Sequence, residues 1–539
     1  MRPHGHLHDE LAAEAMAPRA GCDVTATAAP ASVRGAGTVL DAAPTVVHLL
    51  ADAAARAPAR EALVCGDERI DHARYLAAVA AFAHELRALG AQGERVATLI
   101  GNSIDGCIAS FAGLAAGAQL APLNALLTPH EMEPILLDAQ PRVFVVQAAL
   151  AAAALPVAQR AGVAHCIVVG DGARRLAEPA LGAALPPLPA ADAPALLQYT
   201  GGTTGRPKGV ELTHRALAVN VAQREALLPT REGDRVLCMM PLSHAYGMAM
   251  GLLLAVRAAS TLVILPRYQP DAVLDTVPRE RIGVFLGSPT IFVGLLSHPR
   301  CAGTDWRSVH TCYSGAAALA AATLERWRAV TGAPVFEGYG MTEAGPVLAF
   351  NPARGPVKPG SVGAPVPDTT IEIVDVDTGA RVLARGDSGE IRVRGPQLMR
   401  GYRNRPDETA LALRDGWLYT GDIGAIDDDG FLTIRDRKKD MAIVGGYNVY
   451  PREVEEVLFA HPDVADAAVI GVPDAYRGEV LRACVVARPG SGSDAAALQA
   501  FCAQRLSRYK VPAEVRFMAA LPKTAANKTD KAALRGAQP

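Results

Sequence analysis

The chain carries Tyr199-Thr-Gly-Gly-Thr-Thr-Gly-Arg-Pro-Lys-Gly209 between two apolar segments. Glycines in such a loop let backbone N–H groups converge on anionic oxygens, and threonine hydroxyls add further hydrogen-bond donors. Lys208 supplies a point charge suited to a terminal phosphate. A flexible surface loop would also be rich in glycine and threonine, but a turn requires neither three hydroxyls nor the Pro-Lys-Gly ending. The stretch therefore predicts a polyphosphate site.

Two familiar nucleotide-binding motifs do not fit this stretch. A kinase-type phosphate loop needs Gly-Lys followed by Ser or Thr, whereas Lys208 follows proline and precedes Gly209. The dinucleotide fingerprint has its nearest match in Gly338-Tyr-Gly-Met-Thr-Glu343, which fails at the third glycine. We therefore expect a nucleotide that is held by another fold.

Length and composition describe a globular protein of more than one domain. With 539 residues, half of them hydrophobic, the chain is too long for one core. Its formal net charge of −2 gives no electrostatic case for a nucleic-acid partner. Nine scattered cysteines show no Cys-x-x-Cys spacing, which favours reduced thiols in a cytoplasmic protein. Uncharged runs at 106–129 and 236–256 are broken by Pro, Gly and polar residues, so we expect buried core and no integral membrane segment.

The texture of the sequence changes along the chain. Residues 1–40 are rich in Ala, Gly and Pro and are predicted to form a disordered extension. From about 45 to 345, strand-like runs such as 95–100 and 164–169 alternate with alanine-rich helical segments, which indicates α/β layers with parallel strands. Segments 370–374 and 389–393 then predict a smaller β-rich subdomain. The charge run 435–440 is typical of a solvated hinge, and 451–458 beyond it reads as a helix opened by proline.

Three further motifs can complete a nucleotide site. Glu337-Gly-Tyr-Gly-Met-Thr-Glu-Ala344 combines an aromatic face, a hydroxyl and a carboxylate, which suit base stacking, phosphate contact and Mg²⁺ binding. Trp417-Leu-Tyr-Thr-Gly-Asp422 offers a carboxylate for ribose hydroxyls, although an aspartate after glycine is more often an ordinary turn. Pro522-Lys-Thr-Ala-Ala-Asn-Lys528 places a lysine in a polar loop, where most lysines are merely solvated. Only the joint presence of these motifs, in this order, favours the functional interpretation.

Together the motifs resemble the adenylate-forming superfamily, which includes acyl- and aryl-CoA synthetases, over roughly residues 45–535. The strongest match is Arg435-Asp-Arg-Lys-Lys-Asp-Met-Ala-Ile-Val-Gly-Gly-Tyr-Asn-Val-Tyr-Pro451, which looks like the hinge segment of bacterial long-chain fatty acid–CoA ligases. Tyr199–Gly205 and Tyr509-Lys-Val-Pro512 point the same way. The segment 338–348 resembles 4-coumarate–CoA ligases equally well.

The resemblance implies an α/β fold in two parts. The expected N-terminal domain covers 41–437 and contains two layered α/β subdomains and a small β-barrel-like subdomain. The expected C-terminal domain covers 438–539, is small, mobile and of the α+β class, and rotates about a hinge at Lys439.

The implied reaction is ATP-dependent and has two steps. A carboxylic acid and ATP give an acyl-adenylate and pyrophosphate, and the thiol of coenzyme A then gives acyl-CoA and AMP. Mg²⁺ is the implied metal, held by Glu343. The residues that the resemblance assigns to ATP or AMP are Thr200, Gly201, Gly202, Thr203, Thr204, Gly205, Lys208, Gly315, Ala316, Ala317, Glu337, Gly338, Tyr339, Gly340, Met341, Asp422 and Arg437.

Other roles follow from the same resemblance. Lys528 is expected to bridge the carboxylate and the α-phosphate in the first step, where Thr342 contacts that phosphate. His244 is expected to guard the acyl pocket, although without the resemblance a core histidine is the more common interpretation. Gly445 and Gly446 would border the CoA channel. The expected acyl pocket consists of His244, Tyr246, Met250, Val347 and Leu348.

Two positions depart from the family pattern. Gly201 stands where many members have serine, which removes one phosphate donor but leaves three threonines. Asn527 replaces the glycine that usually precedes the catalytic lysine. Because asparagine tolerates a left-handed backbone, we expect a positive φ or a tight turn at this position.

The sequence leaves the substrate open. A medium- or long-chain fatty acid is favoured, and an aromatic acid of the hydroxycinnamate or benzoate type is the alternative. We see no obvious cation for a second carboxylate, so dicarboxylic acids are disfavoured. Acyl transfer to a carrier protein and a non-catalytic nucleotide sensor are disfavoured as well. The expected partners are the acid, ATP and CoA alone, with a homodimer left open.

Overall fold

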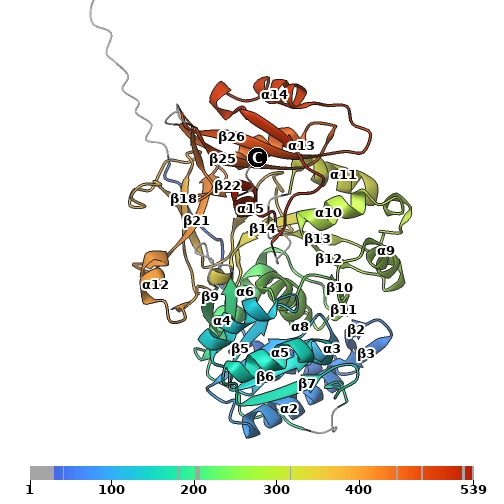
Figure 1. Ribbon diagram of the computed structural model, residues 1–539. Coiled ribbons are helices and arrows are strands. Elements are labelled where there is room, and N and C mark those ends of the chain that lie inside the picture. The colour runs from blue at the N-terminus through green and yellow to red at the C-terminus, as the bar shows by residue number, and fades with distance from the viewer. Residues whose placement is uncertain are drawn as a thin grey trace, which may run out of the picture.

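Two large, mostly parallel sheets form the centre of the molecule, with helices on their faces (Figure 1). The computed structural model describes residues 29–39, 42–178, 183–200, 207–315, 317, 319–444, 447–474, 477–524 and 528–536.

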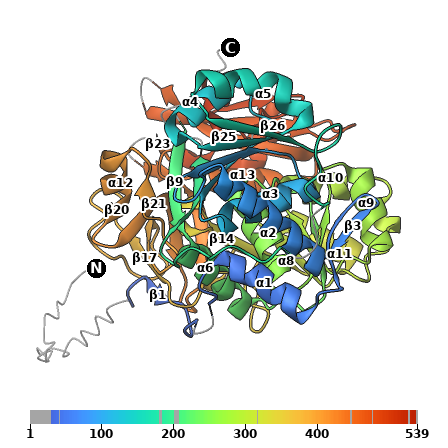
Figure 2. The same cartoon turned by 90° about the horizontal axis from the view of Figure 1, so that it is seen from below.

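The first sheet has seven described strands, and its central strands are parallel as the sequence predicts. Because successive side chains of a strand point to opposite faces, Val96 packs on the side of the first three helices and Ala97 against the next two. Figure 2 shows these two groups of helices on opposite sides. In spatial order the strands are β19 (Gly401–Tyr402), β9 (Lys208–Thr213), β8 (Pro194–Thr200), β5 (Gln119–Leu123), β4 (Arg95–Leu99), β6 (Val143–Gln147) and β7 (His165–Val169). The helices are α1 (Val46–Arg56), α2 (His72–Ala88), α3 (Ile104–Ala115), α4 (Pro129–Ala139) and α5 (Ala148–Arg160).

The second sheet has nine described strands and shares its core with the first, since one continuous apolar cluster contains Val143 of β6 and Val284 of the second sheet. Its order is β16 (Ala364–Pro365), β15 (Val347–Phe350), β14 (Val335–Gly340), β13 (Thr311–Ser314), β12 (Val284–Gly287), β10 (Arg235–Cys238), β11 (Thr261–Ile264), β2 (Glu61–Cys65) and β3 (Glu68–Asp71). The associated helices are α6 (His214–Leu227), α7 (Ala245–Gly247), the π-helical η1 (Met248–Leu253), α8 (Leu254–Arg257), α9 (Pro270–Arg279), α10 (Pro289–Leu296), η2 (Cys301–Gly303), α11 (Ala321–Thr331) and η3 (Thr342–Ala344).

A third, antiparallel sheet forms the smaller β-rich unit, and its first strand corrects a prediction. Residues 32–34 pair with residues 370–372, and the Ser32 hydroxyl donates to Glu372 Oε1 at 3.0 Å. Ala31 is fully buried in the apolar core of this sheet. The predicted disordered extension over 1–40 was therefore wrong for this segment, because its short apolar residues fill a sheet edge. The elements are β1 (Ser32–Arg34), β17 (Thr370–Val374), β18 (Gly389–Arg394), β20 (Leu413–Arg414), β21 (Trp417–Ile426), β22 (Leu432–Arg437) and α12 (Pro406–Ala412).

The C-terminal unit has its own sheet and packs next to the end of β22 (Figure 1). The backbone N–H of Arg452 donates to the buried carboxylate of Asp436 at 2.8 Å, and Arg535 forms an ion pair with Asp440 at 2.8 Å. The predicted helix at 451–458 is confirmed, with Pro451 in its first turn. The elements are β23 (Ala442–Val444), β24 (Tyr447–Val449), α13 (Pro451–Phe459), β25 (Val464–Asp474), β26 (Gly478–Ala487), α14 (Ala495–Ala503), η4 (Arg508–Lys510), β27 (Glu514–Phe517) and α15 (Lys531–Gly536).

The two uncharged runs are mainly core, as the sequence predicts. Residues 107–115 lie in the buried helix α3, and residues 245–256 form a buried helical segment that continues through α7, η1 and α8. Leu126, near the end of the first run, is exposed. In the part of the chain that the structure describes, none of the helices combines the length and apolar character that a membrane crossing requires.

Candidate active site

The two ends of the glycine-threonine loop lie next to each other in the first sheet. Thr200 ends β8 and Lys208 begins β9, and the two are register partners in this antiparallel pair. The loop residues 201–205 lie outside the described residues, so their contacts with phosphate stay predictions. The Lys208 ammonium forms an ion pair with Glu408 of α12 and lies 5.2 Å from the centre of the Tyr402 ring. The loop therefore connects two paired strands, and the lysine at the start of the second strand lies between a carboxylate and an aromatic ring.

Glu343 is a buried carboxylate close to that hairpin. It lies in η3, which begins two residues after the end of β14, and its Oε1 accepts a hydrogen bond from the Tyr402 hydroxyl at 2.8 Å. The backbone oxygen of Glu343 accepts from the Met399 N–H at 2.8 Å. Tyr402 thus contacts Glu343 through its hydroxyl and Lys208 through its ring. This brings the predicted phosphate loop and the predicted metal ligand to one place.

Residues Tyr339, Asp422 and Arg437 form a second polar cluster at the junction of three strands. The Tyr339 hydroxyl donates to Asp422 Oδ2 at 2.6 Å, and Arg437 forms an ion pair with Asp422, with 3.0 Å between Nε and Oδ1. Asp422 and Arg437 are opposite each other in the β21–β22 register. Burial, then the neighbouring Asp422 carboxylate, raises the pKa of Tyr339. Each carboxylate oxygen can accept a further hydrogen bond, so the cluster retains capacity for ribose hydroxyls.

The glycines of β14 are required by close packing. A Cβ at Gly338 would lie 2.2 Å from Phe350 Cε2, and a Cβ at Gly340 would lie 2.1 Å from the backbone oxygen of Pro346. Strand β15 therefore approaches β14 so closely that side chains at these two positions are excluded. The consequence is a fixed geometry for Thr342 and Glu343, which follow directly.

Glu337 lies beneath the loop that contains Gly315 and Ala317. Its Oε2 accepts a hydrogen bond from the Leu319 backbone N–H at 3.2 Å. Burial raises the pKa of Glu337 to about 7, against a lowering effect of that N–H and of Arg452 on α13. Glu337 therefore anchors the backbone at Leu319, and the positive charge of Arg452 favours its ionised form. Ala316, within the same loop, lies outside the described residues, and Ala317 is exposed.

His244 lies at the beginning of α7, where its Nδ1 accepts a hydrogen bond from the Tyr246 backbone N–H at 3.2 Å. Burial, then the nearby Lys528, lowers the pKa of His244 to about 4, so the ring is neutral at pH 7. The Tyr246 hydroxyl donates to the backbone oxygens of Gly287 and Tyr313, at 3.1 and 3.3 Å. Its ring lies so close to Gly315 that a Cβ there would be 3.0 Å away.

Lys528 connects these groups. The loop before it is closed by hydrogen bonds from the Thr524 N–H to the Lys528 oxygen, 2.7 Å, and from the Lys528 N–H to Thr524 Oγ1, 3.2 Å. The side chain is solvent-accessible, yet the surrounding protein and then Arg437 lower its pKa, while Asp422 and Glu343 act in the opposite direction. Lys528 is thus within electrostatic reach of residues that are far apart in the sequence.

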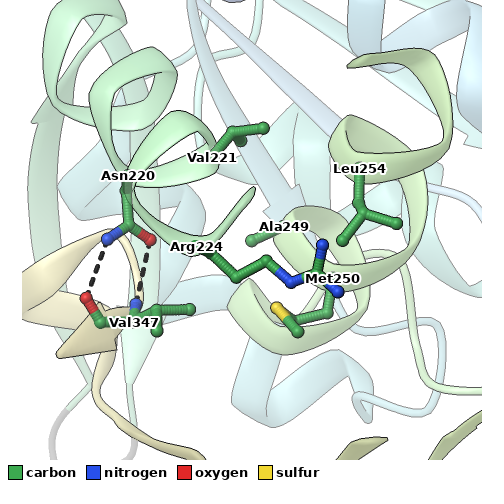
Figure 3. Close-up of a pocket in the computed structure, with 7 residues that line it drawn as sticks. All are labelled: Asn220, Val221, Arg224, Ala249, Met250, Leu254 and Val347. Atoms are coloured by element: carbon green, nitrogen blue, oxygen red, sulfur yellow. Dashed lines mark hydrogen bonds between the residues drawn. The ribbon is translucent and has the colours of Figure 1, made fainter. Parts of the chain in front are cut away.

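The acyl-pocket assignment stays a prediction, although the structure places each of its residues. Met250 and Val347 line a small cavity, shown in Figure 3. Leu348 is wrong as a pocket residue, because alternate residues of β15 face opposite sides and Leu348 packs in the core of the third sheet. His244 and Tyr246 are not among the residues around this cavity. The other lining residues are Asn220, Val221, Arg224, Ala249 and Leu254.

Three residues of the candidate site and the adjoining cavity were not predicted from the sequence. Tyr402 and Glu408 approach Lys208 and Glu343 only because the two-residue strand β19 pairs with β9. Arg224 lies in α6, a helix that carries none of the motifs from which the site was predicted. The sequence signal that could have identified Arg224 is the presence of an arginine on a helix face that is otherwise buried.

Some predicted residues cannot be placed. Gly445, Gly446 and Asn527 lie outside the described residues, so the CoA channel and the positive φ stay predictions. Lys439 is exposed, in a turn closed by the Asp440 N–H to the Arg437 oxygen at 2.9 Å. Its role as a hinge also stays a prediction.

The family of the chain follows from comparison with known proteins. Residues 50–403 match the AMP-binding enzyme family, and residues 453–528 match the AMP-binding enzyme C-terminal domain. A long-chain-fatty-acid–CoA ligase of Bacillus subtilis is 37% identical, over 90% of this chain and 93% of its own. A feruloyl-CoA synthase of an Amycolatopsis species is also 37% identical, over 87% of this chain and 94% of its own.

The fold agrees with that match. The crystal structure of ATP-bound MatB from Rhodopseudomonas palustris superimposes with a TM-score of 0.84 at 33% identity, over 91% of this chain and 98% of that one. The multi-sheet N-terminal part, the small C-terminal part and both family models point to one conclusion: this chain belongs to the AMP-binding enzymes of the adenylate-forming superfamily.

Proposed function

We propose that the chain activates a carboxylic acid as its adenylate and transfers the acyl group to CoA. In the first step a carboxylate oxygen attacks the α-phosphorus of ATP and pyrophosphate leaves. In the second step the CoA sulfur attacks the acyl carbon, its proton is released, and AMP leaves. The observation that carries this proposal is the electrostatic proximity of Lys528 to Glu343, Asp422 and Arg437.

Lys528 supplies positive charge where negative charge accumulates in the first step. The backbone of Lys528 is hydrogen-bonded to Thr524, and a charge that is in position before the reaction needs little reorganisation. Asp422 and Arg437 hold the ribose, and Tyr339 fixes the orientation of Asp422. His244 is neutral and within electrostatic reach of Lys528, which lets it line the path of the acid without adding charge.

Glu343 fits a magnesium ligand. The hydrogen bonds of the described residues engage its Oε1, which leaves Oε2 available. Within the described ranges, no group of three or more His, Cys, Asp and Glu side chains is arranged to hold a metal ion unaided. This agrees with the preference of Mg²⁺ for one or two carboxylates together with phosphate oxygens and water. When bound, Mg²⁺ would neutralise phosphate charge.

Replacement of Glu343 by glutamine tests this assignment. The amide keeps an acceptor for the Tyr402 hydroxyl but removes the charge, so the Mg²⁺ concentration for half-maximal adenylation should rise at least about tenfold. The matched control is Glu372→Gln, which removes a half-buried carboxylate paired with Arg392 on the third sheet. An unchanged Mg²⁺ requirement in Glu343→Gln would exclude Glu343 as a ligand.

The pH dependence of adenylation tests the state of Lys528. Lys528 acts while protonated, and its pKa is lowered from the ordinary 10.5 by the surrounding protein and then by Arg437. The rate should therefore fall as the pH rises, and it should do so at a lower pH than for an unperturbed lysine. In Lys528→Arg the guanidinium stays protonated, so any residual activity should lack this decline. The same alkaline decline in both proteins would assign it to another group.

The favoured substrate is a medium- or long-chain fatty acid, a proposal supported by the name and the near-complete overlap of the Bacillus relative. The second candidate is an aromatic acid, supported by the equally similar feruloyl-CoA synthase. Pyrophosphate release and acyl-CoA formation with C8–C18 acids, cinnamates and benzoates, each with and without CoA, test both. Release with cinnamates but not with C8–C18 acids would overturn the fatty-acid version. A failure of every acid would overturn the proposed function.

A further inference from the structure

Arg224 is buried beside the predicted acyl pocket. Its side chain in α6 is about 1% exposed, and its guanidinium lies 4.4 Å from the centre of the Tyr313 ring. Nη1 forms an ion pair with Glu225 and donates to Thr230 Oγ1 at 2.8 Å. One end of the guanidinium is therefore anchored to the helix and its following turn.

The other end has no partner. Within the described residues, Nε and Nη2 of Arg224 are buried and make no hydrogen bond. Figure 3 shows the guanidinium extending into the cavity, next to Met250 and Leu254. Buried donors in native proteins are nearly always paired, and an unpaired one is unfavourable. These N–H groups are therefore available for an acceptor that enters the cavity.

A series of electrostatic and hydrogen-bond interactions extends from the proposed reaction centre towards Arg224. Lys528 lies within electrostatic reach of His244, the backbone of Tyr246 is hydrogen-bonded to His244, and Arg224 is within electrostatic reach of Tyr246. Met250 continues the same helical segment. Arg224 thus lies at the end of this series that is farther from Lys528.

Charge balance indicates the kind of acceptor. The guanidinium charge is already balanced by Glu225, whose side chain is only 16% exposed. A second carboxylate would leave an uncompensated negative charge in a poorly hydrated place, which is costly. A neutral oxygen would pair with the free N–H groups and leave the balance unchanged. Hydrocarbon alone would leave the donors unpaired.

The size of the cavity limits the group that reaches Arg224. Its volume is about 10 Å³, on the order of one water molecule. A substrate can enter only if flexible side chains such as Met250 rearrange. Asn220 holds α6 against β15 through both of its amide atoms, at 2.7 and 2.9 Å, so the wall on that side is fixed. A compact end group is therefore accommodated more readily than an extended chain.

We propose that Arg224 is a specificity-determining residue that binds a neutral oxygen, such as a hydroxyl, ether or ketone, at the end of the acid opposite its carboxylate. The inference rests on the proposed function and narrows its substrate class. It also keeps dicarboxylic acids disfavoured, because Glu225 already balances the charge of Arg224.

The test compares matched acids in acid-dependent pyrophosphate release. The pairs are cinnamate with 4-hydroxycinnamate and octanoate with 7-oxooctanoate, and octanedioate represents a second carboxylate. In at least one pair, the oxygenated acid should have a kcat/KM at least about tenfold higher, as expected when a site contains buried donors. Octanedioate should be the poorest of the aliphatic acids.

Variants separate recognition from structure. Arg224→Met should abolish the preference within the pair while the acid without the oxygen is used as well as before or better. Glu225→Gln removes the balancing charge and should improve octanedioate relative to 7-oxooctanoate. Arg235→Met is the matched control, because Arg235 also has a buried, unpaired Nε but lies in an ion network with Glu61 and Glu280.

Several results would overturn the inference. Equal use of both members of each pair by the wild-type protein would do so whether or not the variants fold. An equal loss for both members in Arg224→Met, with a lowered unfolding temperature, would assign Arg224 a structural role. If the wild-type protein releases no pyrophosphate with any acid, the proposed function itself fails, which is a distinguishable outcome.

Discussion

Lys528→Ala should lose adenylation and retain thioester formation. The ammonium stabilises charge that develops in the first step, and removal of one such preorganised group commonly costs about 10²–10³ in rate. The second step begins from a finished acyl-adenylate, in which this charge is no longer developing. ATP–pyrophosphate exchange measures the first step, and acyl-CoA formation from a supplied acyl-adenylate measures the second.

Lys523→Ala is the matched control for Lys528→Ala. Lys523 lies on the same loop, but its ammonium contacts Asp466 and Thr529, at 3.2 and 3.1 Å, away from the nucleotide site. We expect both half-reactions to be nearly unaffected. An equal loss of both half-reactions in Lys528→Ala would contradict the separate role of the lysine and the proposed rotation about Lys439.

Gly340→Ala should have the second large effect. The added Cβ would lie 2.1 Å from the Pro346 backbone oxygen, and a backbone atom cannot move aside as a side-chain end can. Strand β15 must therefore shift, which disturbs the register of Gly340 with Val347 and moves Thr342 and Glu343. Overpacking typically costs about 1–3 kcal/mol of stability, and a misplacement of about 1 Å can cost about 10²-fold in rate.

The control for Gly340→Ala is Gly492→Ala. A Cβ at Gly492 would meet no atom within 4 Å, and its φ is outside the range that disfavours side chains. Thermal unfolding and ATP–pyrophosphate exchange should be unchanged in this variant. Normal exchange by Gly340→Ala at a temperature where it is folded would show that the approach of β15 does not position the phosphate-binding residues.

Local patterns predicted much of the fold. The segment 370–374 is a strand with the predicted bounds, and the helix at 451–458 begins at its proline. Both signals are local, since alternation of apolar and polar residues marks a strand and a proline in the first turn marks a helix start. Residues 32–34 were missed because their strand exists only through pairing with β17, more than 300 residues away. Composition cannot reveal such a partner.

In the candidate site, too, local motifs were predicted and features that depend on packing were not. Tyr339, Asp422, Glu343 and Lys528 were found through ordered motifs, and the structure brings them together. Leu348 was misassigned because a motif gives positions along a strand but not the face on which each side chain lies. Arg224, by contrast, was missed because its significance lies in unpaired N–H groups, which only packing creates.

The central claim, that the site forms an acyl-adenylate, is tested most directly by ATP–pyrophosphate exchange in the absence of CoA. We predict that exchange requires a carboxylic acid and Mg²⁺, proceeds without CoA, and is lost in Lys528→Ala but not in Lys523→Ala. Exchange that requires CoA, or release of ADP and phosphate in place of AMP and pyrophosphate, would contradict the account.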